Sequence, residues 1–205
     1  MSDSIYGEYR ETMEYVMQNM EARLSTINNR VFRETGEHLY EHFSCRIKSE
    51  ESMREKCRRK NLPETPHSAL VELKDGIGVR VICSFVDDIY KLVDEIKAFG
   101  DCEVIREKDY IRHAKENGYR SYHMILSMEV PFPDVEGRRP GIYLVEVQIR
   151  TIAMDTWASL EHRMKYKKNI PSQQLLVAEL KRCADELASC DISMQTIREL
   201  IRAGE

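Results

Sequence analysis

AKENGYRSYHMIL, residues 114–126, places two tyrosines, an arginine, a serine and a histidine in the five residues after a glycine. A polar loop ends at that glycine, and the alternating residues that follow predict a strand over 119–130. In such a strand Tyr119, Ser121 and His123 share one face, whereas Arg120 and Tyr122 point the other way. A tyrosine that follows a glycine can stack on a nucleobase, but cross-strand packing explains both tyrosines equally well.

The rest of the chain predicts one α+β domain with a mixed sheet. Further strands are predicted over 76–85, 101–110 and 142–150. Apolar spacing and capping residues predict five helices, over Ile5–Val31, Ser49–Lys60, Asp87–Gly100, about 151–167 and about 172–202. The resulting order, α-α-β-α-β-β-β-α-α, predicts a sheet flanked by helices, with long helices at both termini.

Composition indicates a soluble, globular protein. The chain has 205 residues, of which 42% are hydrophobic and 32% charged. It contains no apolar run of membrane-spanning length, and its first residues lack the pattern of a secretory signal, so we expect a cytoplasmic protein with no membrane partner. None of the six cysteines forms a Cys-x-x-Cys pair, and we expect free thiols.

Charge is unevenly distributed along the chain. The net charge is −4, which argues against a general nucleic-acid binder. The segment Arg46–Lys60 nevertheless holds seven Lys or Arg residues and only three acids. Such a basic patch suits a compact anionic ligand, although charge alone favours a solvated helix face.

Polar residues alternate along the strand predicted from YLVEVQIRT, residues 143–151. Glu146, Gln148 and Arg150 share one face, and three apolar residues share the other. That polar face is either exposed to water or forms the floor of a polar cleft.

A carboxylate also lies at the start of the strand predicted over 76–85. Asp75 precedes Gly76 and Gly78, which allow a close approach of ligand or backbone, and Arg80 shares the face of Gly78. If this strand is a neighbour of 142–150, Asp75 and Glu146 could share a Mg²⁺ ion, with phosphate oxygens completing its shell.

Taken in order, these segments resemble the synthetase domain of the RelA/SpoT family. The similarity runs from Arg46 to about Lys168 and rests on RIKSEESMREK (46–56), LKDGIGVRVIC (73–83), EKDYI (107–111), NGYRSYH (117–123), VEVQIRT (145–151) and WASLEH (157–162). With no other domain in its 205 residues, the chain looks like a stand-alone small alarmone synthetase. NGYRSYH followed by VEVQIRT is the most specific part of the match.

The resemblance implies a nucleotidyltransferase-like fold and a single domain, 1–205. Its core would span about 40–168. The terminal helices, 1–35 and 172–205, would serve oligomerisation, and the expected assembly is a homotetramer. The implied enzyme is a Mg²⁺-dependent GTP pyrophosphokinase of the stringent response. It would move the β,γ-pyrophosphate of ATP to the 3′-hydroxyl of GDP or GTP, giving ppGpp or pppGpp and AMP.

The family's site residues map onto this sequence one by one. Asp75 and Glu146 would be catalytic and bind the metal, and Glu146 could also accept the proton of the 3′-hydroxyl. The resemblance implies ATP-binding roles for Arg46, Lys48, Ser52, Lys56 and Arg80, with the two arginines enclosing adenine. It implies GDP- or GTP-binding roles for Asn117, Tyr119, Ser121, His123, Gln148 and Arg150, with the Tyr119 ring stacked on guanine.

Several features delimit this interpretation. No histidine is followed by aspartate, so we expect no alarmone hydrolase. HFSCRIK (42–48) departs from the pattern of the subgroup with an allosteric alarmone site.

The alternative function is a non-catalytic regulator that binds nucleotides or single-stranded RNA, and either ligand is a candidate effector. Binding alone would not require both Asp75 and Glu146. A nucleotidyltransferase that releases pyrophosphate would usually show a Gly-Ser motif followed by Asp-x-Asp, which is absent.

Overall fold

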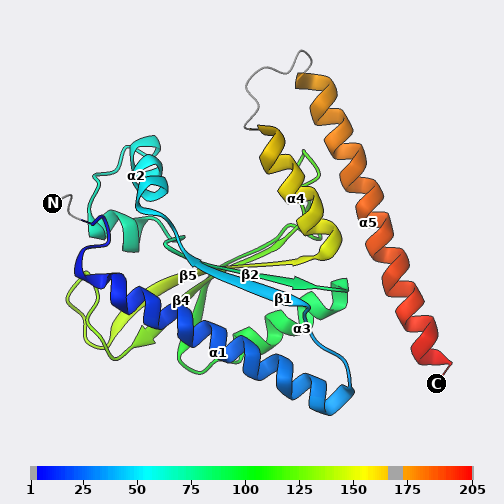
Figure 1. Cartoon of the computed structure of the whole chain (residues 1–205), viewed down its shortest axis with the longest axis horizontal. Coiled ribbons are helices and arrows are strands. Elements are labelled where there is room, and N and C mark those ends of the chain that lie inside the picture. The colour runs from blue at the N-terminus through cyan, green and yellow to red at the C-terminus, as the bar shows by residue number, and fades with distance from the viewer. Residues whose placement is uncertain (1–3, 166–172, 205) are drawn as a thin grey trace.

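A mixed sheet organises the chain in the computed structural model, which describes residues 4–165 and 173–204 (Figure 1). The strand order is β1-β2-β5-β4-β3. The β2 and β5 strands are parallel, and the other neighbours are antiparallel. The strands are β1 (His42–Ile47), β2 (Ile77–Cys83), β3 (Cys102–Asp109), β4 (Tyr122–Val130) and β5 (Gly141–Thr151).

Helices lie on both sides of this sheet, with α1 and α3 below it and α2 and α4 above it in Figure 1. Their bounds are η1 (Gly7–Tyr9), α1 (Arg10–Thr35), α2 (Glu50–Arg59), η2 (Ser68–Glu72), α3 (Val86–Lys97), α4 (Ile152–Lys165) and α5 (Gln173–Ala203). The expected helix boundaries at 167 and 172, and the expected core boundary at 168, lie outside the described residues. In the described ranges no helix has the length and apolarity needed to cross a membrane.

One sheet face is buried beneath α1. Met13, Val16, Met20 and Leu24, which follow helical spacing, are all fully buried in the same core as the apolar side chains of β2, β4 and β5. The apolar stripe of the N-terminal helix therefore belongs to the fold. This buried stripe is not available for the oligomerisation expected of residues 1–35.

The opposite sheet face carries a polar row. Strand register aligns Arg80 of β2 with Gln148 of β5, Gln148 with His123 of β4, and His123 with Lys108 of β3. Because successive side chains alternate, this row lies on the face opposite Val147. The alternation predicted for β5 is thus confirmed, and so is the pairing of the strands that follow Asp75 and contain Glu146.

One strand was not predicted and several boundaries differ, including those of the N-terminal helix, which was expected over Ile5–Val31 and spans Arg10–Thr35. HFSCRI forms edge strand β1, but its mixture of polar and apolar residues gives only a weak alternating pattern. The strand predicted from 119 begins at Tyr122, so Tyr119–Ser121 approach the sheet in irregular conformation. Helix α3 begins at Val86 after an N-cap at Phe85, which places Asp87 in the first turn instead of at the cap.

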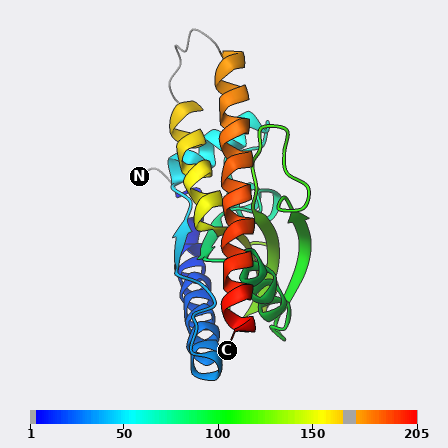
Figure 2. The same ribbon diagram turned by 90° about the vertical axis from the view of Figure 1, so that its right-hand side faces the viewer.

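A second, smaller cluster joins α4 to α5, which run side by side in Figure 2. Trp157 packs with Ala184, and its indole Nε1 donates to the Leu180 carbonyl oxygen at 2.7 Å. Gly118 adopts φ of +89°, and a Cβ there would lie 2.5 Å from Cβ of Ala184. Tyr119 also packs on this cluster. Helix α5 therefore supports the loop that leads into β4.

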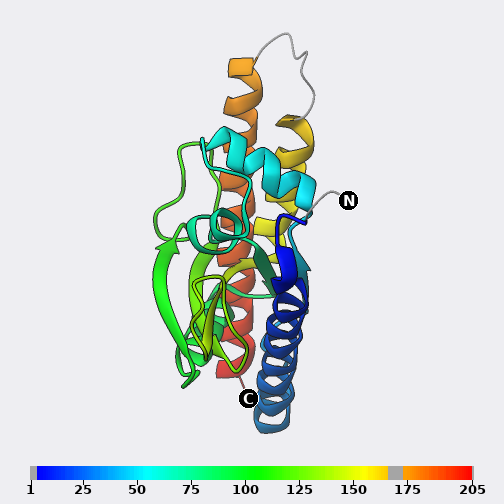
Figure 3. The same cartoon turned by 90° about the vertical axis from the view of Figure 1, so that its left-hand side faces the viewer.

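The N-terminal segment holds α2 at the other end of the sheet, where Figure 3 shows α2 near the start of α1. The Tyr6 hydroxyl donates to the Lys48 carbonyl oxygen at 2.6 Å, and Ser4 Oγ donates to Glu50 Oε1 at 2.6 Å. Ser49 caps α2 by accepting from the Ser52 backbone N–H, as the sequence predicts.

Candidate active site

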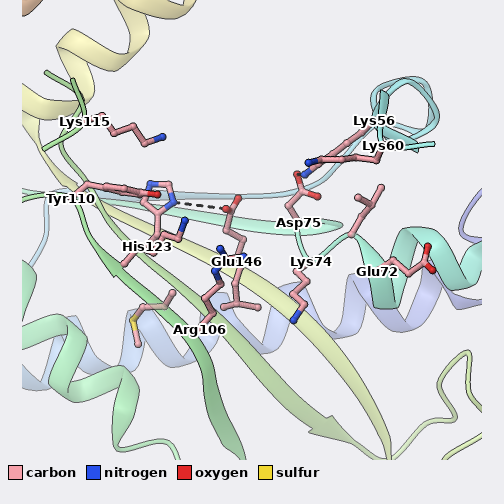
Figure 4. Close-up of a pocket in the computed structure, with 14 residues that line it drawn as sticks. Lys56, Lys60, Glu72, Lys74, Asp75, Arg106, Tyr110, Lys115, His123 and Glu146 are labelled. Atoms are coloured by element: carbon pink, nitrogen blue, oxygen red, sulfur yellow. Dashed lines mark ion pairs between the residues drawn. The ribbon is translucent and has the colours of Figure 1, made fainter. Parts of the chain in front are cut away.

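Two adjoining pockets occupy the polar side of the sheet. The large pocket has a volume of about 460 Å³ and is shown in Figure 4. The small pocket measures about 100 Å³. Asp75 and Glu146 line both pockets. The two carboxylates predicted to act together therefore stand where the pockets meet.

The small pocket brings together six of the predicted site residues, namely Arg46, Lys48, Asp75, Arg80, Glu146 and Gln148. Its lining is Ser44, Arg46, Lys48, Asp75, Gly78, Val79, Arg80, Glu146 and Gln148. Arg46 on β1 pairs in register with Gly78 on β2, and the missing side chain at Gly78 leaves room beside Glu146. The predicted ATP residue Lys56 lies across the boundary, in the lining of the large pocket.

Arg80 stands in the small pocket with spare hydrogen-bonding capacity. Its Nη1 lies 3.7 Å from Asp155 Oδ1, and its buried Nε has no hydrogen-bond partner among the described residues. Burial, followed by the charge of Arg150, lowers the pKa of Arg80 from its ordinary value. A planar, partly desolvated guanidinium of this kind is suited to stacking on a ligand ring.

Asp75 lies in the turn before β2 and is held by two lysines. Lys48 Nζ and Lys56 Nζ contact Asp75 Oδ2 at 2.6 Å and 2.5 Å. Burial acts to raise the pKa of Asp75, but these lysines outweigh it and hold the pKa below its ordinary value. Asp75 Oδ1 is buried and has no hydrogen-bond partner in the part of the chain that is described.

Glu146 lies between Gln148 and His123. Gln148 Nε2 donates to Glu146 Oε2 at 3.1 Å, and His123 Nδ1 lies 3.8 Å from Glu146 Oε1 (Figure 4). Burial, together with Arg150, Lys115 and Lys108, lowers the pKa of His123 to about 3. The imidazole is therefore neutral at pH 7, and its contact with Glu146 is not an ion pair at that pH.

Arg150 forms the centre of a buried network below the large pocket. Its side chain is 6% exposed. Nη2 donates to the Tyr119 hydroxyl at 2.8 Å and to Gln148 Oε1 at 2.9 Å, while Nη1 donates to Asp155 Oδ1 at 2.8 Å. These bonds fix Gln148 and Tyr119 relative to each other, so Arg150 positions other site residues from beneath.

Cations cover the ring of Tyr119. Lys115 Nζ lies 4.8 Å from the ring centroid, and the Arg150 guanidinium carbon lies 5.4 Å from it. Lys115 Nζ is also 4.7 Å from the ring centroid of Tyr110. The Tyr119 hydroxyl is 2.7 Å from His123 Nε2, which confirms that these two side chains meet. A base could stack on the Lys115 side of Tyr119 only after the ammonium moves away.

Other predicted site residues do not line either pocket. Ser52 is exposed in the first turn of α2, where its hydroxyl bonds to Ser49. Asn117 donates to Glu161 and accepts from the Tyr119 backbone N–H. Ser121 is fully buried and donates to the Ile149 carbonyl oxygen. Ser121 precedes the first residue of β4, Tyr122, and accepts from Arg150 Nε, so it belongs to the buried network instead of the pocket lining.

The large pocket has a basic wall that was not predicted from the sequence. Six Lys or Arg side chains line this pocket against three carboxylates. The lining residues not predicted are Lys60, Glu72, Leu73, Lys74, Arg106, Lys108, Tyr110, Lys115, Met124 and Ile125. Alternation along REKDY (106–110) was the available signal, since it puts Arg106, Lys108 and Tyr110 on one side of β3.

The geometry fits a metal ion whose coordination shell is completed by phosphate oxygens of a bound substrate. No group of three or more His, Cys, Asp or Glu side chains in residues 4–165 and 173–204 could hold a metal ion by itself. Two carboxylates do border both pockets, and the buried Asp75 Oδ1 lacks a partner within these ranges. Mg²⁺ commonly takes one or two carboxylates together with substrate phosphates. The residues present fit that arrangement.

Comparison with known proteins places the chain in a family. A model of the region found in RelA/SpoT proteins matches residues 45–171. GTP pyrophosphokinase YwaC of Bacillus subtilis is 37% identical over 185 residues, covering 90% of this chain and 86% of the relative. GTP pyrophosphokinase YjbM of the same organism is 33% identical over 200 residues, covering 97% and 90%.

Solved structures agree with the sequence comparison. The crystal structure of small alarmone synthetase 1 from Bacillus subtilis, bound to its product pppGpp, has a TM-score of 0.79 and 33% identity. The alignment covers 92% of this chain and 94% of that one. Matches in sequence and fold therefore extend over nearly the whole molecule, and the chain belongs to the RelA/SpoT family.

Proposed function

We propose that this protein transfers the β,γ-pyrophosphate of ATP to the 3′-hydroxyl of GDP or GTP, giving ppGpp or pppGpp and AMP. The observation that carries the proposal is the meeting of two pockets at Asp75 and Glu146. A transfer between two nucleotides needs two binding sites whose reacting ends meet. The GTP pyrophosphokinase names of the relatives and the pppGpp bound to a structural neighbour support the same reaction.

ATP is assigned to the small pocket and its boundary. Arg46 and Arg80 would enclose adenine, which suits the partly desolvated guanidinium of Arg80. Lys48 and Lys56 would bind the phosphates near Asp75. Ser52 is retained as a prediction for phosphate binding, although reaching the phosphates would require a change from its hydrogen bond with Ser49.

GDP or GTP is assigned to the large pocket. Its basic lining suits the 5′-phosphates, and the cluster of Tyr119, Tyr110 and His123 suits guanine. Asn117 would act through the loop that presents Tyr119, because its side chain accepts from the Tyr119 backbone N–H. Ser121, Gln148 and Arg150 would hold that site in place through the buried network.

Asp75 and Glu146 would hold Mg²⁺, which would neutralise charge on the transferring phosphates. The orphaned Oδ1 of Asp75 supports this choice. Glu146 is also suited to accept the proton of the attacking 3′-hydroxyl, since it borders both pockets. A neutral His123 beside it can position the acceptor by hydrogen bonding without adding positive charge.

Self-association is proposed to use α5, with a homotetramer as the expected assembly. Leu180 and Leu187 pack toward α4, but other large apolar side chains of the same helix are exposed. They are Leu175, Val177, Ile192, Met194, Ile197, Leu200 and Ile201. A second copy of this chain would cover such side chains.

The proposal is tested by incubating the protein with labelled ATP and GDP or GTP, with and without Mg²⁺. We expect a guanosine tetra- or pentaphosphate together with AMP, and only when Mg²⁺ is present. Asp75→Asn and Glu146→Gln should abolish transfer while the circular dichroism spectrum stays unchanged. Near-wild-type turnover by either folded variant would contradict the assignment of the two carboxylates.

A further inference from the structure

The carboxylate assigned to the metal is engaged by the protein's own lysines. Lys48 follows β1 and Lys56 lies on α2, and both ammonium groups contact the same oxygen, Asp75 Oδ2. All three side chains are shielded, with exposed fractions of 22% for each lysine and 16% for Asp75. The other oxygen, Oδ1, is buried and unpartnered among the described residues. The local charge is therefore positive at the carboxylate a divalent cation would use.

This arrangement opposes the binding of a metal ion on its own. A divalent cation at Asp75 would come close to both ammonium groups, and like charges repel strongly where water is partly excluded. Further cations line the adjoining large pocket and add to the repulsion. A nucleoside triphosphate reverses these conditions, because its phosphate oxygens attract the lysines and provide ligands for the metal.

We propose that Lys48 and Lys56 close Asp75 to divalent cations until a polyphosphate draws the two lysines away. The metal then enters with the donor nucleotide, and the free protein has little affinity for it. This inference rests on the proposed function, which supplies ATP as the polyphosphate. Because coupling between two ligands is reciprocal, the metal must raise nucleotide affinity by the same factor by which nucleotide raises metal affinity.

A purely structural role for these ion pairs predicts a different outcome. If the lysines only attached α2 to the sheet, removing them would lower thermal stability and weaken metal and nucleotide binding together. If they guard Asp75, removing them changes the two affinities in opposite directions. Metal binding to the free protein becomes tighter, and nucleotide binding becomes weaker, since the phosphates lose their partners.

The experiment titrates Mn²⁺ into the nucleotide-free protein and measures unbound Mn²⁺ by electron paramagnetic resonance. The combined variant Lys48→Met, Lys56→Met should bind Mn²⁺ at least tenfold more tightly than wild type. Adding Asp75→Asn should remove that gain. Lys181→Met is a matched control, since it breaks a 2.7 Å pair with Asp185 that lies outside both pockets, and it should not change Mn²⁺ affinity.

A second measurement follows nucleotide binding to the same variants by calorimetry, with an ATP analogue that carries a methylene bridge between the α- and β-phosphorus atoms. Its affinity should fall at least tenfold in the double variant. Lys56→Met alone provides the same comparison if the double variant does not fold. Equal Mn²⁺ affinity in wild type and folded lysine variants would overturn the proposal. Neither titration needs turnover, so this result is separable from failure of the transfer assay.

Discussion

Replacing Tyr119 by Phe or by Ala separates the contribution of its ring from that of its hydroxyl. The hydroxyl accepts from Arg150 at 2.8 Å and lies 2.7 Å from His123 Nε2. Arg150 is almost fully buried, so Tyr119→Phe leaves one of its donors without this partner. A hydrogen bond to a charged group contributes about 1.5–3 kcal/mol, and we take the lower end because Gln148 still accepts from the same nitrogen.

A decrease of about 1.5 kcal/mol in the free energy of unfolding corresponds to a decrease in melting temperature of about 3–6 °C for a chain of this size. Tyr119→Phe should therefore be less stable but should keep most of its guanine-nucleotide affinity, because the ring that stacks on the base remains. Tyr119→Ala removes that ring as well, and should lose roughly 1–3 kcal/mol of GDP binding, or about one to two decades in affinity. ATP affinity should barely change in either variant.

The assay measures melting temperature by differential scanning fluorimetry, and ATP and GDP affinities by separate calorimetric titrations. Equal losses of GDP affinity in the Phe and Ala variants would show that the hydroxyl carries acceptor binding. An unchanged melting temperature for Tyr119→Phe would refute the stabilising role of the Arg150 network. An equal loss of affinity for ATP and GDP in Tyr119→Ala would instead show that the Tyr119 ring serves packing.

Three further changes test other parts of the account. Gly118→Ala should destabilise the protein by about 1–3 kcal/mol, because alanine disfavours φ of +89° and its Cβ would meet Ala184. A melting temperature equal to that of the wild type would contradict this. Arg46→Ala and Arg80→Ala should weaken ATP binding and spare GDP binding in calorimetry, and a defect confined to GDP would reverse the assignment of the pockets. Leu200→Glu should dissociate the assembly in light scattering, whereas a wild-type protein that is already monomeric would refute self-association through α5.

Local patterns predicted the parts of the site that depend on one strand. The alternation of Glu146 and Gln148 with buried valines follows from period two, and the structure confirms it. The proximity of Asp75 and Glu146 needed one more assumption, that their strands are neighbours. The parallel pairing of β2 with β5 satisfies it.

Features that depend on long-range packing were not accessible in this way. The apolar stripe of α1 has the same spacing whether it faces a sheet or another subunit, and only the tertiary fold shows that Met13 and Met20 are fully buried. Ser121 and Arg150 were assigned to a ligand on the family resemblance, yet the fold pairs them with each other and Ser121 with neighbouring backbone. The role of Lys115 over two tyrosine rings depends on a loop whose path the sequence does not specify.

The fate of the phosphates of ATP distinguishes pyrophosphate transfer from other nucleotide chemistry. ATP labelled with ¹⁸O in its β- and γ-phosphates is incubated with GDP, Mg²⁺ and the protein, and the products are identified by mass spectrometry. For pyrophosphate transfer we expect both labelled phosphates to move together to the 3′-position and one AMP to appear for each tetraphosphate. Formation of ADP with a singly phosphorylated acceptor, or release of labelled pyrophosphate with an adenylated acceptor, would contradict it.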